Sequence, residues 1–334
     1  MSGGVWLPAR VRWAAPRTVV ALLVLSLLAV LPFLATAFGF EYYIGFGTRV
    51  LIYALAAIGL NFILGFGGLV SFGHAMYVML GAYAVAIPIT LGMPAGWLHL
   101  ALAIGLCALV AAVVGAIALR TTGIAFIMIT LAFAQMLYFG AVGLKDFGGD
   151  DGLSIAERST WPGLDLGHPA TLYYVALVAV LIALYLSWRA VLSPFGLVFR
   201  ASKANARRAI ALGHPVARYQ WVAYVLSAVT CGVAGALLAN LTQFASPSYG
   251  AWTLSGELIV IVIIGGIGTV FGPVIGAIIL LALEEMLPAL VDAVMPDYKS
   301  NWMLLLGLFI FIVALALKRG VYGSLAEGSR GEGP

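Results

Sequence analysis

The sequence is poor in charged residues, which make up only 9% of its 334 positions. A soluble globular domain usually carries about a quarter charged residues. Only two cysteines are present, Cys107 and Cys231; both lie in apolar runs, which excludes a disulfide framework and the spacing of a metal site. Because hydrophobic residues fill 63% of the chain, lipid rather than water must cover most of its surface. The composition therefore predicts an integral membrane protein.

The sequence also lacks the motifs of self-contained chemistry. It contains no G-x-x-x-x-G-K-[ST] phosphate loop and no H-E-x-x-H, and its histidines are scattered among different segments. Ser71 and His74 are three residues apart on one predicted helix, but no carboxylate in that span could orient a nucleophile and a base. No charged residue occupies the middle of an apolar run, and Glu257 lies only at the edge of one. These absences disfavour an intramembrane enzyme and a proton-coupled carrier.

Ten apolar runs are present, and each is of roughly the length of a membrane-spanning helix. They cover residues 19–38, 49–66, 70–91, 97–119, 124–143, 171–188, 219–241, 258–270, 272–287 and 302–317. We expect an all-α, polytopic membrane protein with about ten transmembrane helices, or eight if the segment broken by "GGIGTVFGP" forms a re-entrant pair. One transmembrane domain would cover 19–317, between a cytoplasmic segment at 1–18 and a disordered tail at 318–334.

The first run has an alternative interpretation. Three arginines precede it and "ATA" ends it, which also resembles a cleavable signal peptide. Its length favours a retained helix.

The distribution of Lys and Arg predicts the orientation. A cytoplasmic N-terminus and ten alternating spans place most of the 17 basic residues inside, leaving only Arg49, Lys145, Arg158 and Lys299 outside. The predicted outer loop 144–170 carries five acidic residues against two basic ones. Both termini are then cytoplasmic.

Few polar residues fall at the predicted depth of the membrane, and such residues are candidates for function or for hydrogen bonds between helices. As a translocation path we select Asn61, Ser71, His74, Thr130, Gln135 and Tyr138. Small residues recur every four positions at Ala228, Gly232 and Ala236, and again at Gly268, Gly272 and Gly276, which suits close helix packing or a pathway.

The longest predicted cytoplasmic loop, 189–218, concentrates basic side chains and contains no acid. Within it, Ser202 is predicted to cap a helix that ends at Gly213. The loop could simply touch anionic lipid, but the chain has no energy source of its own. Docking to a partner that hydrolyses ATP is the better interpretation.

Several segments resemble one family. They are "GLNFILGFGGLVSFGHAMYVMLGAY" (59–83), "TLAFAQMLYF" (130–139), "FGGDDGL" (147–153), "ARRAIALG" (206–213), "YVLSAVTCGVAGAL" (224–237) and "IVIVIIGGIGTVFGPVIGA" (259–277). In this order they are similar to the LivM-type permease family of bacterial branched-chain amino-acid ABC importers. Nearly the whole chain is covered.

The resemblance implies a type II ABC importer-like helical permease in the bacterial inner membrane, without an ATPase site or a cofactor of its own. Its implied partners are a LivH-type permease, two cytoplasmic ATPase subunits that bind ATP, and a periplasmic substrate-binding protein. It further implies that 200–213 is the coupling helix, whose contact residues are Arg200, Lys203, Arg207, Arg208, Ala211 and Gly213. The family often has glutamates where this chain has Ala204, Ala206 and Ile210, so a contact through acids cannot be assumed.

The implied solutes are leucine, isoleucine and valine. Related permeases carry urea or short amides, with a loop closer to "GGNNGL"; "GGDDGL" at 148–153 leans toward amino acids. We expect the binding protein to dock at Asp150 and Asp151. A self-contained channel or a secondary carrier remains the alternative.

Overall fold

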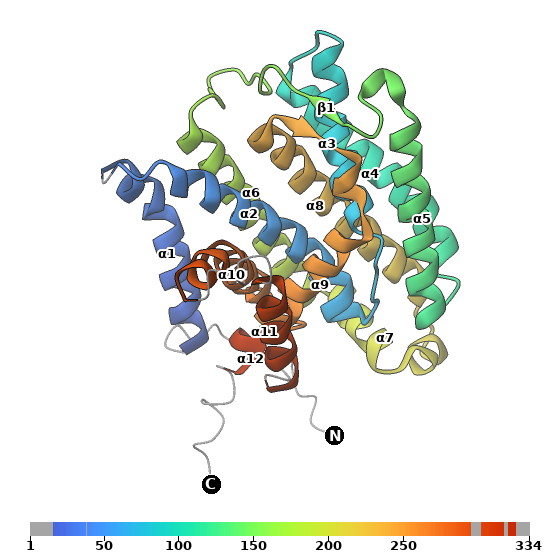
Figure 1. Ribbon diagram of the computed structural model, residues 1–334. Coiled ribbons are helices and arrows are strands. Elements are labelled where there is room, and N and C mark those ends of the chain that lie inside the picture. Colours follow the sequence, from blue (N-terminus) through green and yellow to red (C-terminus); the bar gives the residue numbers. More distant parts are fainter. Residues whose placement is uncertain (1–15, 38, 295–301, 317–319, 325–334) are drawn as a thin grey trace.

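The computed structural model describes residues 16–37, 39–294, 302–316 and 320–324, which are almost wholly helical (Figure 1). In chain order the α-helices are α1 (Pro16–Ala37), α2 (Tyr42–Asn61), α3 (Ala75–Thr90), α4 (Gly96–Ala118), α5 (Ile124–Gly143), α6 (Pro169–Leu192), α7 (Pro194–Ala211), α8 (Val216–Thr242), α9 (Trp252–Gly265), α10 (Gly272–Val294), α11 (Trp302–Ala316) and α12 (Gly320–Ser324). A π-helix, η1 (Phe62–Phe66), continues α2, and η2 (Lys145–Phe147) and η3 (Pro247–Gly250) are short 3-10 helices. The strands β1 (Leu153–Ser154) and β2 (Phe244–Ala245) pair antiparallel, with Leu153 opposite Ala245.

Within the described part of the chain, seven helices are long and apolar enough to cross a membrane, and three shorter apolar helices accompany them. These ten helices correspond one by one to the ten apolar runs of the sequence. The prediction of an all-α, polytopic membrane protein is confirmed.

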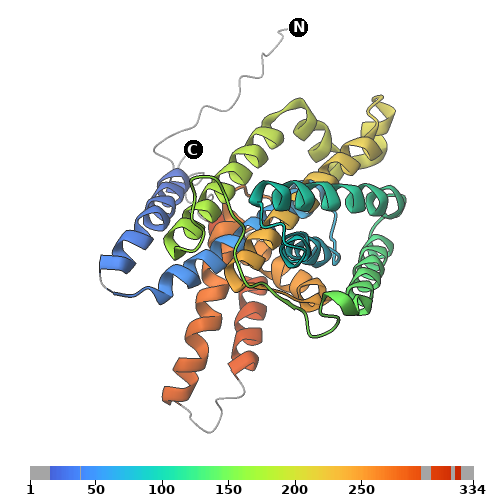
Figure 2. The same cartoon turned by 90° about the horizontal axis from the view of Figure 1, so that it is seen from above.

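The helix α8 lies at the centre of the fold, where α2, α3 and α4 pack against it (Figures 1 and 2). Glycines let α3 and α8 approach closely: a Cβ at Gly81 would overlap the carbonyl of Gly232, and a Cβ at Gly235 would overlap that of Val78. Gly232 belongs to the small-residue series noted in the sequence. By contrast, α1 and α5 lie at opposite sides of the molecule and expose many large apolar side chains, as helices do when their outer faces contact lipid.

The turn at 266–271 joins α9 and α10 into a hairpin. Gly266 and Gly268 have φ values of 120° and 75°, which favour glycine and end α9. A Cβ at Gly276 would overlap the carbonyl of Ile261, so the second glycine series also packs helix on helix.

Two helix boundaries predicted in this region were wrong. The run expected at 258–270 is a helix at Trp252–Gly265, because buried Ser255 accepts a hydrogen bond from Ala75 N (2.9 Å) and so lies inside the fold despite its polarity. The run expected to end at 287 continues to Val294. There Glu284 and the exposed Glu285 contact Arg49 and Tyr42 of α2.

The third helix also begins later than expected, at Ala75 rather than residue 70. Residues 67–74 form an irregular segment after η1, in which Gly68 has a φ of 71°. Ser71 and His74 therefore do not lie along one helix as predicted; both precede it.

The expected terminal segments are only partly described. Residues 1–15 of the 1–18 segment, and 318–319 and 325–334 of the 318–334 tail, lie outside the described residues. Residues 320–324, which were expected to be disordered, instead form α12. Tyr322 is buried there, and its ring packs against Phe271 with 5.7 Å between centroids.

Loop contacts gather at two ends of the bundle. At one end, the segment after α2 contacts α7 and the α9–α10 turn. At the other end, Pro94 bonds to Thr160, and β1 pairs with β2. Figure 1 shows α7 at the bottom and β1 at the top of the bundle. These ends are called the α7 end and the β1 end below.

Candidate functional site

Ser193 caps the start of α7, and its Oγ accepts a hydrogen bond from Gly196 N at 3.3 Å. The prediction that Ser202 caps the helix is wrong, because the Ser202 hydroxyl lies inside α7 and donates to the carbonyl of Phe199 (2.7 Å). Inside α7, Asn205 leaves the helical conformation with φ −161° and ψ 96°, and its Oδ1 caps a second helical piece by accepting from Arg208 N at 2.9 Å.

The predicted end of α7 is confirmed, because Gly213 has a φ of 88°, which suits a glycine after a helix. The two helical pieces form an elbow at Asn205.

The far side of this elbow is exposed. Every residue from 204 to 208 is exposed, including Arg207 and Arg208. Ile210 is 59% exposed and Leu212 is 72% exposed beside these basic groups. An apolar centre with a charged rim is typical of a protein interface.

The near side of α7 is anchored in the transmembrane core. Phe199 is 1% exposed and stacks between Phe62 and Phe195, with centroid distances of 5.8 and 6.1 Å. Its ring lies directly over Gly67, where no Cβ would fit. Lys203 Nζ donates a hydrogen bond of 2.7 Å to the carbonyl of Gly65 in η1. The elbow thus holds the π-helix through one buried ring and one ammonium group.

Asn61, the last residue of α2 directly before the π-helix, contacts the turn between α9 and α10. Asn61 Nδ2 donates to the carbonyl of Thr269 at 2.8 Å, and Gly268 N donates to Asn61 Oδ1 at 3.0 Å. A continuous series of contacts therefore runs from α7 through η1 to this turn. Single-turn π-helices frequently occur at functional sites.

His74 is fully buried between two hydroxyl groups. Its Nδ1 lies 2.9 Å from Ser71 Oγ and its Nε2 lies 2.9 Å from Ser227 Oγ. Ser227 donates its proton to the carbonyl of Gly59 (2.6 Å), so its oxygen accepts from Nε2–H, and Nδ1 accepts from Ser71. The imidazole is neutral in this arrangement and joins the irregular 67–74 segment to α8.

Three predicted path residues lie on α5. Thr130 is buried and its backbone packs against Gly73, while Gln135 and Tyr138 are half-buried farther along the helix. With a rise of about 1.5 Å per residue, they lie about 7 and 12 Å beyond Thr130. The structure thus gathers Ser71, His74 and Thr130 at the 67–74 segment, places Asn61 beside it at η1, and sets Gln135 and Tyr138 apart. Their role in translocation stays a prediction.

Sequence reasoning missed two hydroxyl groups in this network, Ser227 and Ser255. Each is a polar side chain beside or within an apolar run, which was the available signal. Among the described residues, no three His, Cys, Asp or Glu side chains lie close enough to hold a metal ion.

At the β1 end, Asp150 and Asp151 are exposed within a turn made by Gly148, Gly149 and Gly152, all with positive φ. The β1–β2 pairing and a hydrogen bond from Ile155 N to the carbonyl of Gln243 (2.9 Å) tie this loop to the end of α8. The two carboxylates are therefore presented on an ordered loop.

Charged residues also gather where α2 meets α10. Arg49 Nη2 lies 3.9 Å from Glu284 Oε2, and its guanidinium lies 5.5 Å from the ring centre of Tyr53. Tyr42 donates to Glu285 (2.5 Å). The ionisable side chains of α2 and α10 thus pair with each other where these two helices meet.

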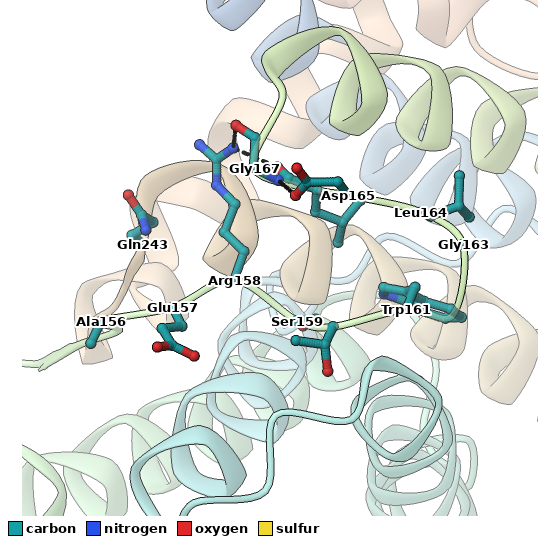
Figure 3. Close-up of a pocket in the computed structure, with 12 residues that line it drawn as sticks. Ala156, Glu157, Arg158, Ser159, Trp161, Gly163, Leu164, Asp165, Gly167 and Gln243 are labelled. Atoms are coloured by element: carbon teal, nitrogen blue, oxygen red, sulfur yellow. Dashed lines mark hydrogen bonds between the residues drawn. The ribbon is translucent and has the colours of Figure 1, made fainter.

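Two neighbouring cavities share Arg158, and the second of them includes part of this cluster. One, of about 770 Å³, lies under the 156–167 loop (Figure 3). The other, of about 420 Å³, lies between the outer parts of α2, α6, α8 and α10. Arg158 lines both, and its Nη1 donates to the carbonyls of Leu166 (2.6 Å) and Gly167 (3.1 Å).

Comparison with known proteins supports a transport role. Residues 42–315, from α2 through α11, match the family described as "Branched-chain amino acid transport system / permease component". The chain is 26% identical over 298 residues to the high-affinity branched-chain amino acid transport system permease protein LivM of Escherichia coli K12, covering 82% of this chain and 68% of that protein. The LivM protein of Salmonella typhimurium is 25% identical with the same coverage. The LivH permease protein of E. coli K12 is 25% identical over 301 residues, covering 81% of this chain and 91% of LivH. No solved structure matched significantly.

Proposed function

Because the chain belongs to the permease family of branched-chain amino acid ABC importers, in which it is the transmembrane subunit and carries no ATPase domain, we propose that it conducts leucine, isoleucine and valine across a bacterial inner membrane. Family membership implies separate ATPase and binding-protein partners, so the energy for transport comes from outside this chain. A self-contained channel or secondary carrier does not fit that membership.

The coupling role of α7 is supported by its two-sided geometry. Its exposed side carries Arg207 and Arg208 beside Ile210 and Leu212, which suits docking to a soluble subunit better than contact with lipid headgroups alone. Its buried side contacts η1 through the ring of Phe199 and the ammonium group of Lys203. A helix that only touched the membrane surface would not need this second attachment.

The proposed motion follows the contacts already described. ATP binding by the partner subunits moves α7, Phe199 and Lys203 move η1, and Asn61 moves the turn between α9 and α10. The π-helix lies between α7 and this turn, and single-turn π-helices inside α-helices are frequent at functional sites. Tilting of the α9–α10 hairpin would then open a path between this chain and a second permease.

The relatives and the exposed acidic groups support two further partners. Relatives named both LivM and LivH match this chain, which supports pairing with a LivH-type permease. Exposed Asp150 and Asp151 suit docking of a periplasmic binding protein. The basic α7 end faces the cytoplasm in this arrangement, together with both termini.

Transport by the assembled complex tests the proposal. Reconstitution of this chain with a LivH-type permease, two ATPase subunits and the binding protein should give ATP-dependent uptake of labelled leucine, and little uptake of urea or acetamide. Uptake of urea or acetamide in place of leucine would assign the chain to the amide-transporting relatives.

A further inference from the structure

We propose that the 420 Å³ cavity at the β1 end binds the charged main-chain groups of an α-amino acid, with its carboxylate at Arg49 and Arg158 and its ammonium at Glu41 and Glu285. The inference rests on the proposed function and deepens it. It gives this chain a means of distinguishing a zwitterion from urea or an amide.

The cavity has the size and lining of a small-molecule site. Ligand pockets commonly measure about 300–1,000 Å³ and combine apolar walls with a few placed polar groups. Here Phe46, Leu172 and Leu241 supply apolar walls that suit an aliphatic side chain. The four charged residues come from α2 and its start, the 144–168 loop and α10, so both signs of charge converge from separate elements.

Arg158 is the most informative member of this lining. Its Nη1 is held by the carbonyls of Leu166 and Gly167, which fixes the guanidinium in position, as Figure 3 shows. Its Nε is buried without a hydrogen-bond partner, and no carboxylate lies within ion-pair distance of the guanidinium, among the residues that the structure describes. A half-buried guanidinium that is positioned by backbone and lacks an anion is suited to receive a carboxylate from a ligand.

The other charges are also incompletely paired. Arg49 is 46% exposed and meets Glu284 only at 3.9 Å. Glu285 accepts from the Tyr42 hydroxyl, a neutral donor, and Glu41 is exposed without an ion pair in the described part of the chain. A ligand with one charge can pair with either the arginines or the glutamates of this lining, and a neutral ligand can form an ion pair with neither. A zwitterion can pair with both.

A phospholipid headgroup that carries a phosphate and an ammonium offers the same pair of charges. The test therefore uses the full-length chain with its partners in a nonionic detergent, without nucleotide or binding protein. Binding of leucine at millimolar concentration is followed by saturation-transfer difference NMR. The competitors are 4-methylpentanoate, which lacks the ammonium, 3-methylbutylamine, which lacks the carboxylate, urea, and O-phosphoethanolamine.

We expect saturable leucine binding. Each singly charged analogue should be at least tenfold weaker than leucine as a competitor, and urea should not compete. Arg158→Gln should raise the Kd for leucine at least tenfold, whereas Lys145→Gln should change it less than twofold. Lys145 is a matched control, because it is an exposed basic residue of the same loop that lines neither cavity.

Equal competition by urea or by either analogue would overturn the proposal, as would equal Kd values for the two variants. The competitor series needs no variant, so it stands even if Arg158→Gln fails to fold. Displacement of leucine by O-phosphoethanolamine at lower concentration than by leucine itself would assign the cavity to lipid and overturn its role in transport. ATP-driven leucine uptake without leucine binding would refute this site alone; binding without ATP-driven uptake would refute the importer proposal alone.

Discussion

Replacing Lys203 by Met tests the link between α7 and the membrane core. The substitution removes the ammonium that donates 2.7 Å to the carbonyl of Gly65, but it keeps an apolar stem that can rest on Gly68. A hydrogen bond to a charged group contributes about 1.5–3 kcal/mol. Because Lys203 is exposed overall, the lower end of this range applies, and about 1.5 kcal/mol corresponds to roughly a tenfold shift in an equilibrium. If transport requires α7 to hold η1, leucine uptake per ATP hydrolysed should fall several-fold and up to about tenfold.

The assay compares leucine uptake with ATP hydrolysis in proteoliposomes containing the assembled complex. Arg120→Met is the matched control, since Arg120 is an exposed basic residue whose Nε bonds only within its own helix region, to Ala116 at 3.2 Å. The control should keep the normal ratio, and both variants should co-purify with the ATPase subunits. An unchanged ratio for Lys203→Met would refute the link to η1, and lost co-purification would show that Lys203 contacts the ATPase instead.

Three further substitutions probe docking, packing and the buried network. Arg207→Glu combined with Arg208→Glu should abolish co-purification of the ATPase subunits, because both exposed charges are reversed; unchanged co-purification counts against docking through α7. Gly235→Ala should destabilise the protein by about 1–3 kcal/mol, because its Cβ overlaps a carbonyl of α3, whereas Gly45→Ala meets open space and should leave the thermal midpoint nearly unchanged; equal midpoints would contradict the packing. His74→Ala removes two hydrogen bonds of about 1 kcal/mol each and opens a cavity, so thermal unfolding should occur at lower temperature, and an unchanged midpoint would show that the imidazole bridge contributes nothing.

Local sequence features predicted the helices well, because apolar length and glycine positions are local properties. The ten apolar runs all became helices, and Gly213 ended α7 as expected. The glycine-rich 265–273 segment became the turn between two helices. Each of these outcomes depends on residues close together in the chain.

The errors arose where distant contacts decide the structure. Ser255 lies inside α9 because it meets Ala75, which is 180 residues away in sequence. Glu285 meets Tyr42 across 243 residues, so α10 continues beyond the predicted end of its apolar run. The start of α7 at Ser193 rather than Ser202 could not be chosen locally, since both residues are plausible caps; burial of Phe199 against η1 keeps the earlier turns helical.

The candidate site shows the same division. The concentration of basic residues in 189–218 was visible in the sequence, but the attachment of α7 to η1 was not. Likewise, Arg49 and Arg158 were recognised only as two of the few basic residues predicted outside. Their meeting at one cavity depends on the packing of α2, α6 and α8.

The central claim is that this chain provides the route while a separate ATPase provides the energy. The most direct measurement is accumulation of labelled leucine against its gradient by vesicles that contain either the assembled complex or this chain alone. We predict accumulation by the complex with hydrolysable ATP and none by the isolated chain. Accumulation by the isolated chain, without any ATP-hydrolysing subunit, would contradict the account.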